Sequence, residues 1–102
     1  MHHDKLVRDN IPAIIESNGE QAITHIAGDQ EYKQRLENKF YEEGKELFSG
    51  TNVAEELADI LEVVYAIGDF HGISKEEIEK IRIEKYEKRG GFSKRIILEE
   101  TK

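Results

Sequence analysis

Residues 41–63 read YEEGKELFSGTNVAEELADILEV and hold seven carboxylates around two apolar runs, with Lys45 as the single cation. The SGTN stretch in the middle is typical of a helix end followed by a turn. Asn52 is the last residue of this stretch, and Glu55 lies three residues after it, which is the spacing of a capping box at the start of a new helix. The stretch therefore predicts two consecutive helices joined by a short loop, residues 49–52.

Helical patterning continues outward from this stretch in both directions. Asn10 is suited to cap a short N-terminal helix, and Ser74 with Glu77 forms a second capping box. Gly19 and Gly72 are suited to end helices, because glycine readily adopts the left-handed backbone found there. Four helices are expected, over residues 11–17, 29–48, 53–70 and 75–89.

Two further segments look extended. Residues 21–26 alternate apolar and polar side chains and include β-branched residues, and residues 94–98 resemble them. These two segments could pair as short strands. The fold class predicted for the chain is all-α, a helical bundle of about four helices completed by dimerisation, in a single domain that spans residues 1–102.

Composition narrows the classes of protein that this chain could be. A net charge of -7 argues against a protein that binds nucleic acid by neutralising phosphates. The absence of cysteine excludes disulfides and thiolate metal sites. No apolar run approaches the roughly 20 residues of a membrane span, and no secretory signal is visible. A cytoplasmic protein that contacts neither membranes nor nucleic-acid polymers is expected.

Carboxylates fall among apolar residues when both central helices are drawn at 100° per residue. Glu43 lies in the middle of an apolar stripe on the helix expected over residues 29–48, and Glu46 and Lys39 lie along the edge of that stripe. Glu56 lies on the flank of the apolar stripe on the helix expected over residues 53–70, and Asp59 lies one turn further along that helix. The first stripe consists of Tyr32, Leu36, Phe40 and Leu47, and the second of Val53, Leu57, Ile60, Val64 and Ile67.

Carboxylates in an apolar seam need a compensating charge. Two like charges 4 Å apart repel by roughly 4 kcal/mol at an effective dielectric of 20. Residues at i and i+3 share a helix face, so the pairs Glu43/Glu46 and Glu56/Asp59 could hold Mg²⁺ or Mn²⁺ from two facing helices. Solvated surface is the other reading, since the same spacing recurs in residues 76–79 and 84–87.

Three motifs resemble a known family. EEGKE followed by EELAD resembles the EExxE…ExxD signature of the all-α nucleoside triphosphate pyrophosphohydrolases, which are the MazG-like proteins and include phosphoribosyl-ATP pyrophosphohydrolase. KLVRDNIPAII near the start and KRGGFSKRIIL near the end resemble a small single-domain branch of that superfamily. The resemblance implies Mg²⁺-dependent hydrolysis of an α–β phosphoanhydride, which yields a monophosphate and pyrophosphate.

The resemblance also implies roles for individual residues. Glu42 would position the attacking water, and Glu62 is a further candidate acid outside the main set. The catalytic set would be Glu42, Glu43, Glu46, Glu56 and Asp59. The metal ligands would be Glu43, Glu46, Glu56 and Asp59. Cations are also needed to bind the phosphates of the substrate. The candidates for this role are Lys5, Arg8, Lys39, Lys88 and Arg89.

Three functions remain open at this point. The first is a nucleoside triphosphate pyrophosphohydrolase. The second is a non-catalytic metal or nucleotide sensor, and the complete set of acids favours an enzyme over it. The third is phosphoribosyl-ATP hydrolysis, and the KLVRD motif favours the first function over it. A ferritin-like di-iron protein is disfavoured, because the chain has no Glu-x-x-His spacing on two helices.

The third expected helix is apolar over about half of its circumference. A helix that covers a single core needs a stripe of only about 100°. The remaining helices are short or polar, so the excess surface predicts a homodimer, with a Lys or Arg of the partner completing the site. The resemblance also implies a dimer, or a dimer of dimers. The apolar positions are Val53, Leu57, Ile60, Leu61, Val63, Val64, Ile67 and Phe70.

Overall fold

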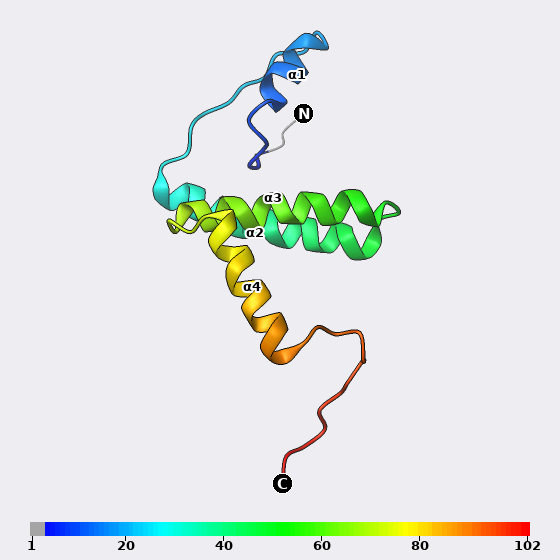
Figure 1. The fold of residues 1–102 in the computed structure, drawn as a ribbon. Helices are drawn as coiled ribbons and strands as arrows, with labels where there is room; N and C mark the ends of the chain where they lie inside the picture. Colours follow the sequence, from blue (N-terminus) through cyan, green and yellow to red (C-terminus); the bar gives the residue numbers. More distant parts are fainter. Residues whose placement is uncertain (1–3) are drawn as a thin grey trace.

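The computed structural model describes residues 4–102, and these residues form four helices and no strand (Figure 1). The all-α prediction is confirmed, and the observed helix bounds agree with the expected ones to within one residue. The helices are α1 (Ile11–Ser17), α2 (Asp29–Ser49), α3 (Val53–Phe70) and α4 (Lys75–Arg89).

Local capping determines where two of the helices begin. The side chain of Asn52 accepts a hydrogen bond from the Glu55 N–H at 3.2 Å, and Ser74 accepts one from the Glu77 N–H at 3.1 Å. Both predicted capping boxes therefore place a side chain on a free backbone donor. Asn10 occupies the cap position of α1, but its side chain makes no capping bond, so that part of the prediction is wrong.

Helices α2 and α3 lie side by side and antiparallel, and they form the packed part of the molecule (Figure 1). Leu36 and Val63 are buried in the seam between them, with exposed fractions of 4% and 8%. Tyr32 and Phe70 meet edge to face near the far end of the pair, with ring centroids 5.7 Å apart. The seam runs from this aromatic contact to the short loop that joins the two helices.

Helix α4 leaves the end of α3 at a steep angle, and Gly68 makes the turn possible. A Cβ atom at Gly68 would lie 2.9 Å from the Ile78 side chain and 3.0 Å from the Ile73 carbonyl oxygen. A larger side chain there would push the two helices apart. Gly72 adopts a φ of 75° in the connection, which favours glycine.

The two ends of the chain reach away from the helix pair on opposite sides. Helix α1 stands on one side, and the irregular tail after α4 extends on the other (Figure 1). Residues 21–26 and 94–98 therefore lie far apart and do not pair. The radius of gyration is 17.8 Å, whereas a compact domain of this length has a value of about 13 Å.

The described chain has a small apolar core. Among residues 4–102, Leu36 and Val63 are the only large apolar side chains that are buried. Many large apolar side chains are half or fully exposed, including Val53, Leu57 and Leu61 on α3. None of the four helices has both the length and the apolarity that crossing a membrane requires.

Candidate metal centre

Three carboxylates converge where α2 ends and α3 begins. Glu43 and Glu46 project from the last turns of α2, and Glu56 projects from the first turn of α3. One oxygen from each carboxylate lies within 4.8 Å of the other two. The short loop and the antiparallel packing of α2 on α3 produce this arrangement, so the predicted grouping of Glu43, Glu46 and Glu56 is observed. We call these three residues the acidic cluster.

Glu43 is the most buried member of the acidic cluster. Only 6% of its surface is exposed, and its Oε2 atom has no hydrogen-bond partner. Its Oε1 atom lies 3.4 Å from the Lys39 ammonium group. Burial raises the pKa of Glu43, the nearby Lys39 partly offsets that rise, and the charges of Glu46 and Asp59 add to it. The site therefore holds a carboxylate whose ionised form has too few partners.

Glu56 repeats this pattern from the opposite helix. Its Oε2 atom is also buried without a hydrogen-bond partner. Burial raises the pKa of Glu56, and the charges of Glu46, Asp59 and Glu43 raise it further. Two orphaned carboxylate oxygens on facing helices would be costly unless something compensates them, because an unsatisfied buried polar group destabilises the fold.

Gly50 allows the loop to close tightly beside the acidic cluster. A Cβ atom at this position would lie 2.7 Å from the Glu46 carbonyl oxygen and 3.7 Å from a carboxylate oxygen of Glu56. The N–H of Gly50 donates to that same Glu46 carbonyl at 2.7 Å. The SGTN stretch predicts a helix end and a turn, but the close approach of the backbone at Gly50 is not visible in the sequence.

Asp59 lies at the border of the acidic cluster and is paired with an arginine. The Arg8 guanidinium donates to Asp59 Oδ1 at 2.7 Å, and both side chains are about half exposed. Asp59 is not one of the three tightly converging carboxylates. Its charge nevertheless adds to the rise in the pKa of both Glu43 and Glu56, so Asp59 acts electrostatically on the cluster without being one of its three members.

Two predicted cations lie beside the acidic cluster. Lys39 is largely buried and lies 3.5 Å from Glu42 as well as 3.4 Å from Glu43. Lys5 approaches Glu42 from the N-terminal segment at 3.4 Å. Glu42 thus lies between two ammonium groups, and Lys39 also contacts Glu43 of the cluster. Glu62 lies further along α3 and is exposed.

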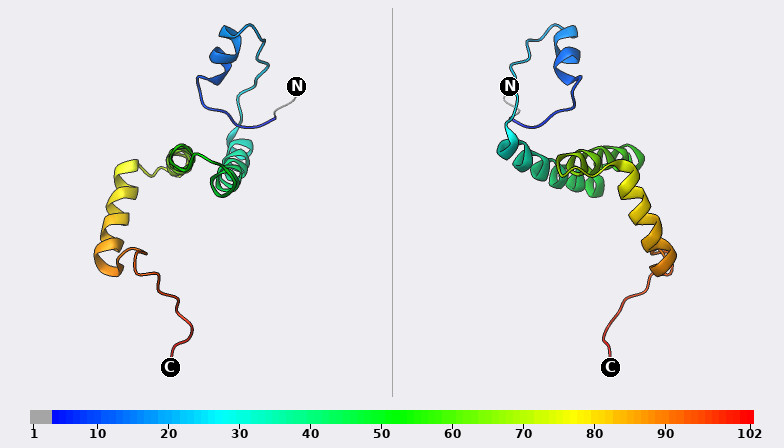
Figure 2. Two further views of the ribbon diagram at one scale, coloured as in Figure 1. Left: turned by 90° about the vertical axis from the view of Figure 1, so that its right-hand side faces the viewer. Right: turned by 60° about the vertical axis from the view of Figure 1, so that its left-hand side comes forward.

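The other two predicted cations do not reach the acidic cluster within one chain. Lys88 and Arg89 lie in the last turn of α4, which points away from the helix pair (Figures 1 and 2). The sequence predicts that both residues bind substrate phosphates, but the steep exit of α4 carries them away from the acidic cluster. Within one chain, Lys88 and Arg89 therefore lie outside this site, and their role in binding substrate stays a prediction.

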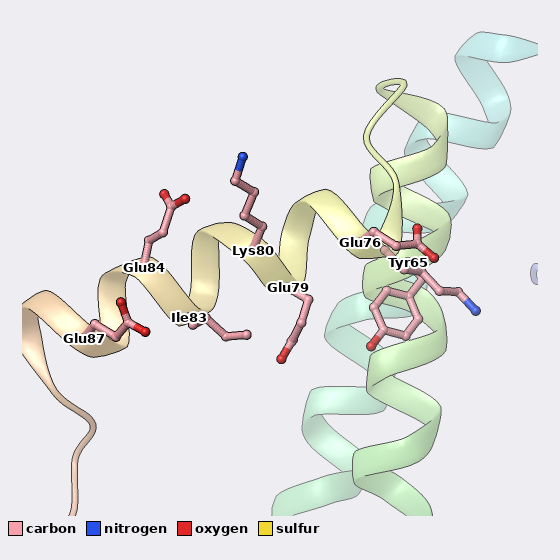
Figure 3. Close-up of a pocket in the computed structure, with 8 residues that line it drawn as sticks. Tyr65, Glu76, Glu79, Lys80, Ile83, Glu84 and Glu87 are labelled. Carbon is pink, nitrogen blue, oxygen red and sulfur yellow. The ribbon is translucent and has the colours of Figure 1, made fainter.

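A separate recess lies in the angle between α3 and α4 (Figure 3). Tyr65 lines it from α3, and Glu76 and Glu79 line it from α4. The Lys75 ammonium lies 4.9 Å from the centre of the Tyr65 ring. Tyr65 is therefore engaged at the α3–α4 junction rather than at the acidic cluster.

The acidic cluster fits a hard divalent cation. Mg²⁺ and Mn²⁺ prefer carboxylate and water oxygens, and the three converging residues offer only carboxylates. The two orphaned oxygens of Glu43 and Glu56 supply acceptors with no protein donor to satisfy them. His25 does not join them, because its Nε2 atom lies 3.0 Å from Glu31 in the first turn of α2, at the other end of the helix from the acidic cluster.

Comparison of the chain with protein-family models, with curated proteins and with solved structures gave no match. The case for a function therefore depends on the geometry of the acidic cluster and on the resemblance of the sequence motifs. Both concern the same stretch of chain, residues 42–59.

Proposed function

We propose that this chain is a Mg²⁺-dependent nucleotide pyrophosphohydrolase of the MazG-like superfamily, with Mn²⁺ as an alternative metal. It would hydrolyse the α–β phosphoanhydride of a nucleoside triphosphate to a monophosphate and pyrophosphate in the cytoplasm. One observation carries the proposal: Glu43 and Glu56, on two helices, each present a buried carboxylate oxygen with no partner. The EEGKE…EELAD motif, which supplies these residues, supports it.

Each residue at the site has a role that follows from its position. Glu43, Glu46 and Glu56 would hold the cation, with Asp59 as a fourth ligand. When bound, a divalent cation supplies charge neutralisation at the phosphates and lowers the pKa of water. Glu42 lies beside the acidic cluster between Lys5 and Lys39. In the proposed reaction it would orient the attacking water and accept its proton.

The cations near the acidic cluster would bind the anionic substrate. Lys39 is held against the carboxylates and would stabilise charge on the phosphates. Arg8 offers a planar guanidinium, which binds phosphate oxygens in pairs. These groups set the orientation of the phosphoanhydride relative to Glu42.

A substrate panel tests this function directly. Nucleoside triphosphates and phosphoribosyl-ATP would each be incubated with the protein and Mg²⁺, and pyrophosphate release would be measured beside orthophosphate release. The proposal expects pyrophosphate from at least one nucleoside triphosphate. Turnover of phosphoribosyl-ATP alone would assign the chain to the second substrate class, and metal binding without any turnover would favour a sensor.

Mg²⁺ is expected to raise the melting temperature of the protein. A ligand that binds only the native state stabilises it by about 2.7 kcal/mol at a concentration of 100 times the dissociation constant. Glu56→Gln should remove most of this rise, since it replaces a carboxylate of the acidic cluster. Glu84→Gln is a matched control on the exposed surface of α4 and should leave the rise unchanged. An unchanged rise in the Glu56 variant would place the cation elsewhere.

A further inference from the structure

A short N-terminal segment is fastened across the helix pair by three ion pairs. We call residues 4–8 the N-terminal strap. Arg35 donates to the Asp4 carboxylate at 2.9 Å and to the Asp4 carbonyl at 2.7 Å. Lys5 pairs with Glu42 at 3.4 Å, and Arg8 pairs with Asp59 at 2.7 Å. The strap thus runs from α2 to α3 beside the acidic cluster.

The three ion pairs of the strap differ in whether they involve a carboxylate that acts on the acidic cluster. Asp4 and Lys5 engage Arg35 and Glu42, which are outside the acidic cluster. Arg8 instead engages Asp59, the carboxylate whose charge acts on both Glu43 and Glu56. Asp4 and Lys5 therefore pair with residues that are not members of the cluster, whereas Arg8 occupies an oxygen of Asp59, the proposed fourth metal ligand.

We propose that Arg8 exchanges partners at this site. It leaves Asp59 when the acidic cluster takes up a divalent cation, while Arg35 and Glu42 keep the rest of the strap in place. The freed guanidinium is then close to the bound cation and available to a phosphate group of the substrate. This inference rests on the proposed function and adds an order to it, in which the metal binds before the nucleotide.

Charge and exposure make the exchange favourable. Without a cation, the Arg8 charge compensates Asp59 in a group of four neighbouring carboxylates. The pair is about half exposed, so it adds little to stability and is easily displaced. A divalent cation at the acidic cluster both attracts Asp59 and repels Arg8. Phosphate is the better partner for the freed guanidinium, because it accepts two parallel hydrogen bonds.

Nuclear magnetic resonance of the ¹⁵N-labelled protein tests the exchange without measuring activity. Trace Mn²⁺ first locates the ion, since it broadens nearby amide signals such as those of Glu43 and Glu56. A Mg²⁺ titration then follows the side-chain Nε–H signals of Arg8 and Arg35. We expect the Arg8 signal to move at the same Mg²⁺ concentration as the cluster amides, while the Arg35 signal stays.

Binding measurements on two variants complete the test. Arg8→Gln removes the competitor for Asp59 and should tighten Mg²⁺ binding by at most about fivefold, since exposed ion pairs are weak. Arg35→Gln removes the same charge from the fastening outside the acidic cluster and should change the affinity less. Cluster amides that shift while the Arg8 signal stays would overturn the exchange alone. Cluster amides that Mn²⁺ does not broaden would overturn the metal site as well.

Discussion

Replacing Glu43 with Gln is expected to abolish nucleotide hydrolysis and, at the same time, to raise the melting temperature of the metal-free protein. The substitution removes a proposed metal ligand, and a loss of roughly 10³-fold in rate corresponds to about 4 kcal/mol of transition-state stabilisation. It also removes a buried charge whose Oε2 atom has no partner. Relief of that burial should stabilise the fold by on the order of 1 kcal/mol, or about 4–8 °C.

The stabilisation by Glu43→Gln should depend on pH in a defined direction. Burial raises the pKa of Glu43 above its ordinary value of 4.5, so the folded state binds the proton more tightly than the unfolded state does. The wild type therefore loses stability as pH rises from 4.5 through the raised folded pKa. The advantage of the variant should be small below pH 4.5 and complete above the folded pKa, as measured by thermal unfolding in a chelator.

Asp59→Asn serves as the paired comparison. Asp59 is half exposed and paired with Arg8, so this variant loses a weak ion pair together with some repulsion. It should abolish hydrolysis with little change in the metal-free melting temperature. Retained activity together with equal destabilisation in both variants would show that the carboxylates are structural.

The helices and the acidic cluster were predictable because their causes are local. Asn52 and Ser74 cap backbone groups three residues away, and this spacing is visible in the sequence. The 3.6-residue period alone placed Glu43 within an apolar stripe, and Glu43 is buried in the structure. Sequence patterns that act within one or two helical turns, such as capping residues and the apolar period, therefore predict where a helix begins and which side chains it buries.

The remaining features depend on contacts between distant parts of the chain. Arg8 and Asp59 are 51 residues apart, and no periodic pattern links them. The direction of α4 depends on the close approach at Gly68, and this direction removes Lys88 and Arg89 from the site. The wide apolar surface of α3 was visible in the sequence, although the elements that cover it were not.

A charge introduced on the uncovered surface of α3 is expected to dissociate and unfold the protein. Val53, Leu57 and Leu61 recur every fourth residue along one face of α3, and each is about half exposed. The views in Figure 2 show α4 leaving this helix pair at an angle, which leaves α3 without a third helix along its length. Because the described chain buries only two apolar side chains in its core, we propose that a second copy covers this face.

Light scattering and thermal unfolding measure the predicted effect. The wild type at low micromolar concentration should have at least twice the monomer mass of 11.8 kDa. Leu57→Glu should give a monomer with a much lower melting temperature, because burying one leucine contributes about 1.5–3 kcal/mol per copy and a buried unpaired charge costs more. Tyr41→Glu is the control: Tyr41 is more exposed than Leu57, and helical spacing puts it on the side of α2 opposite the buried Glu43. The control variant should keep the wild-type mass, and a fully active wild-type monomer would refute the dimer.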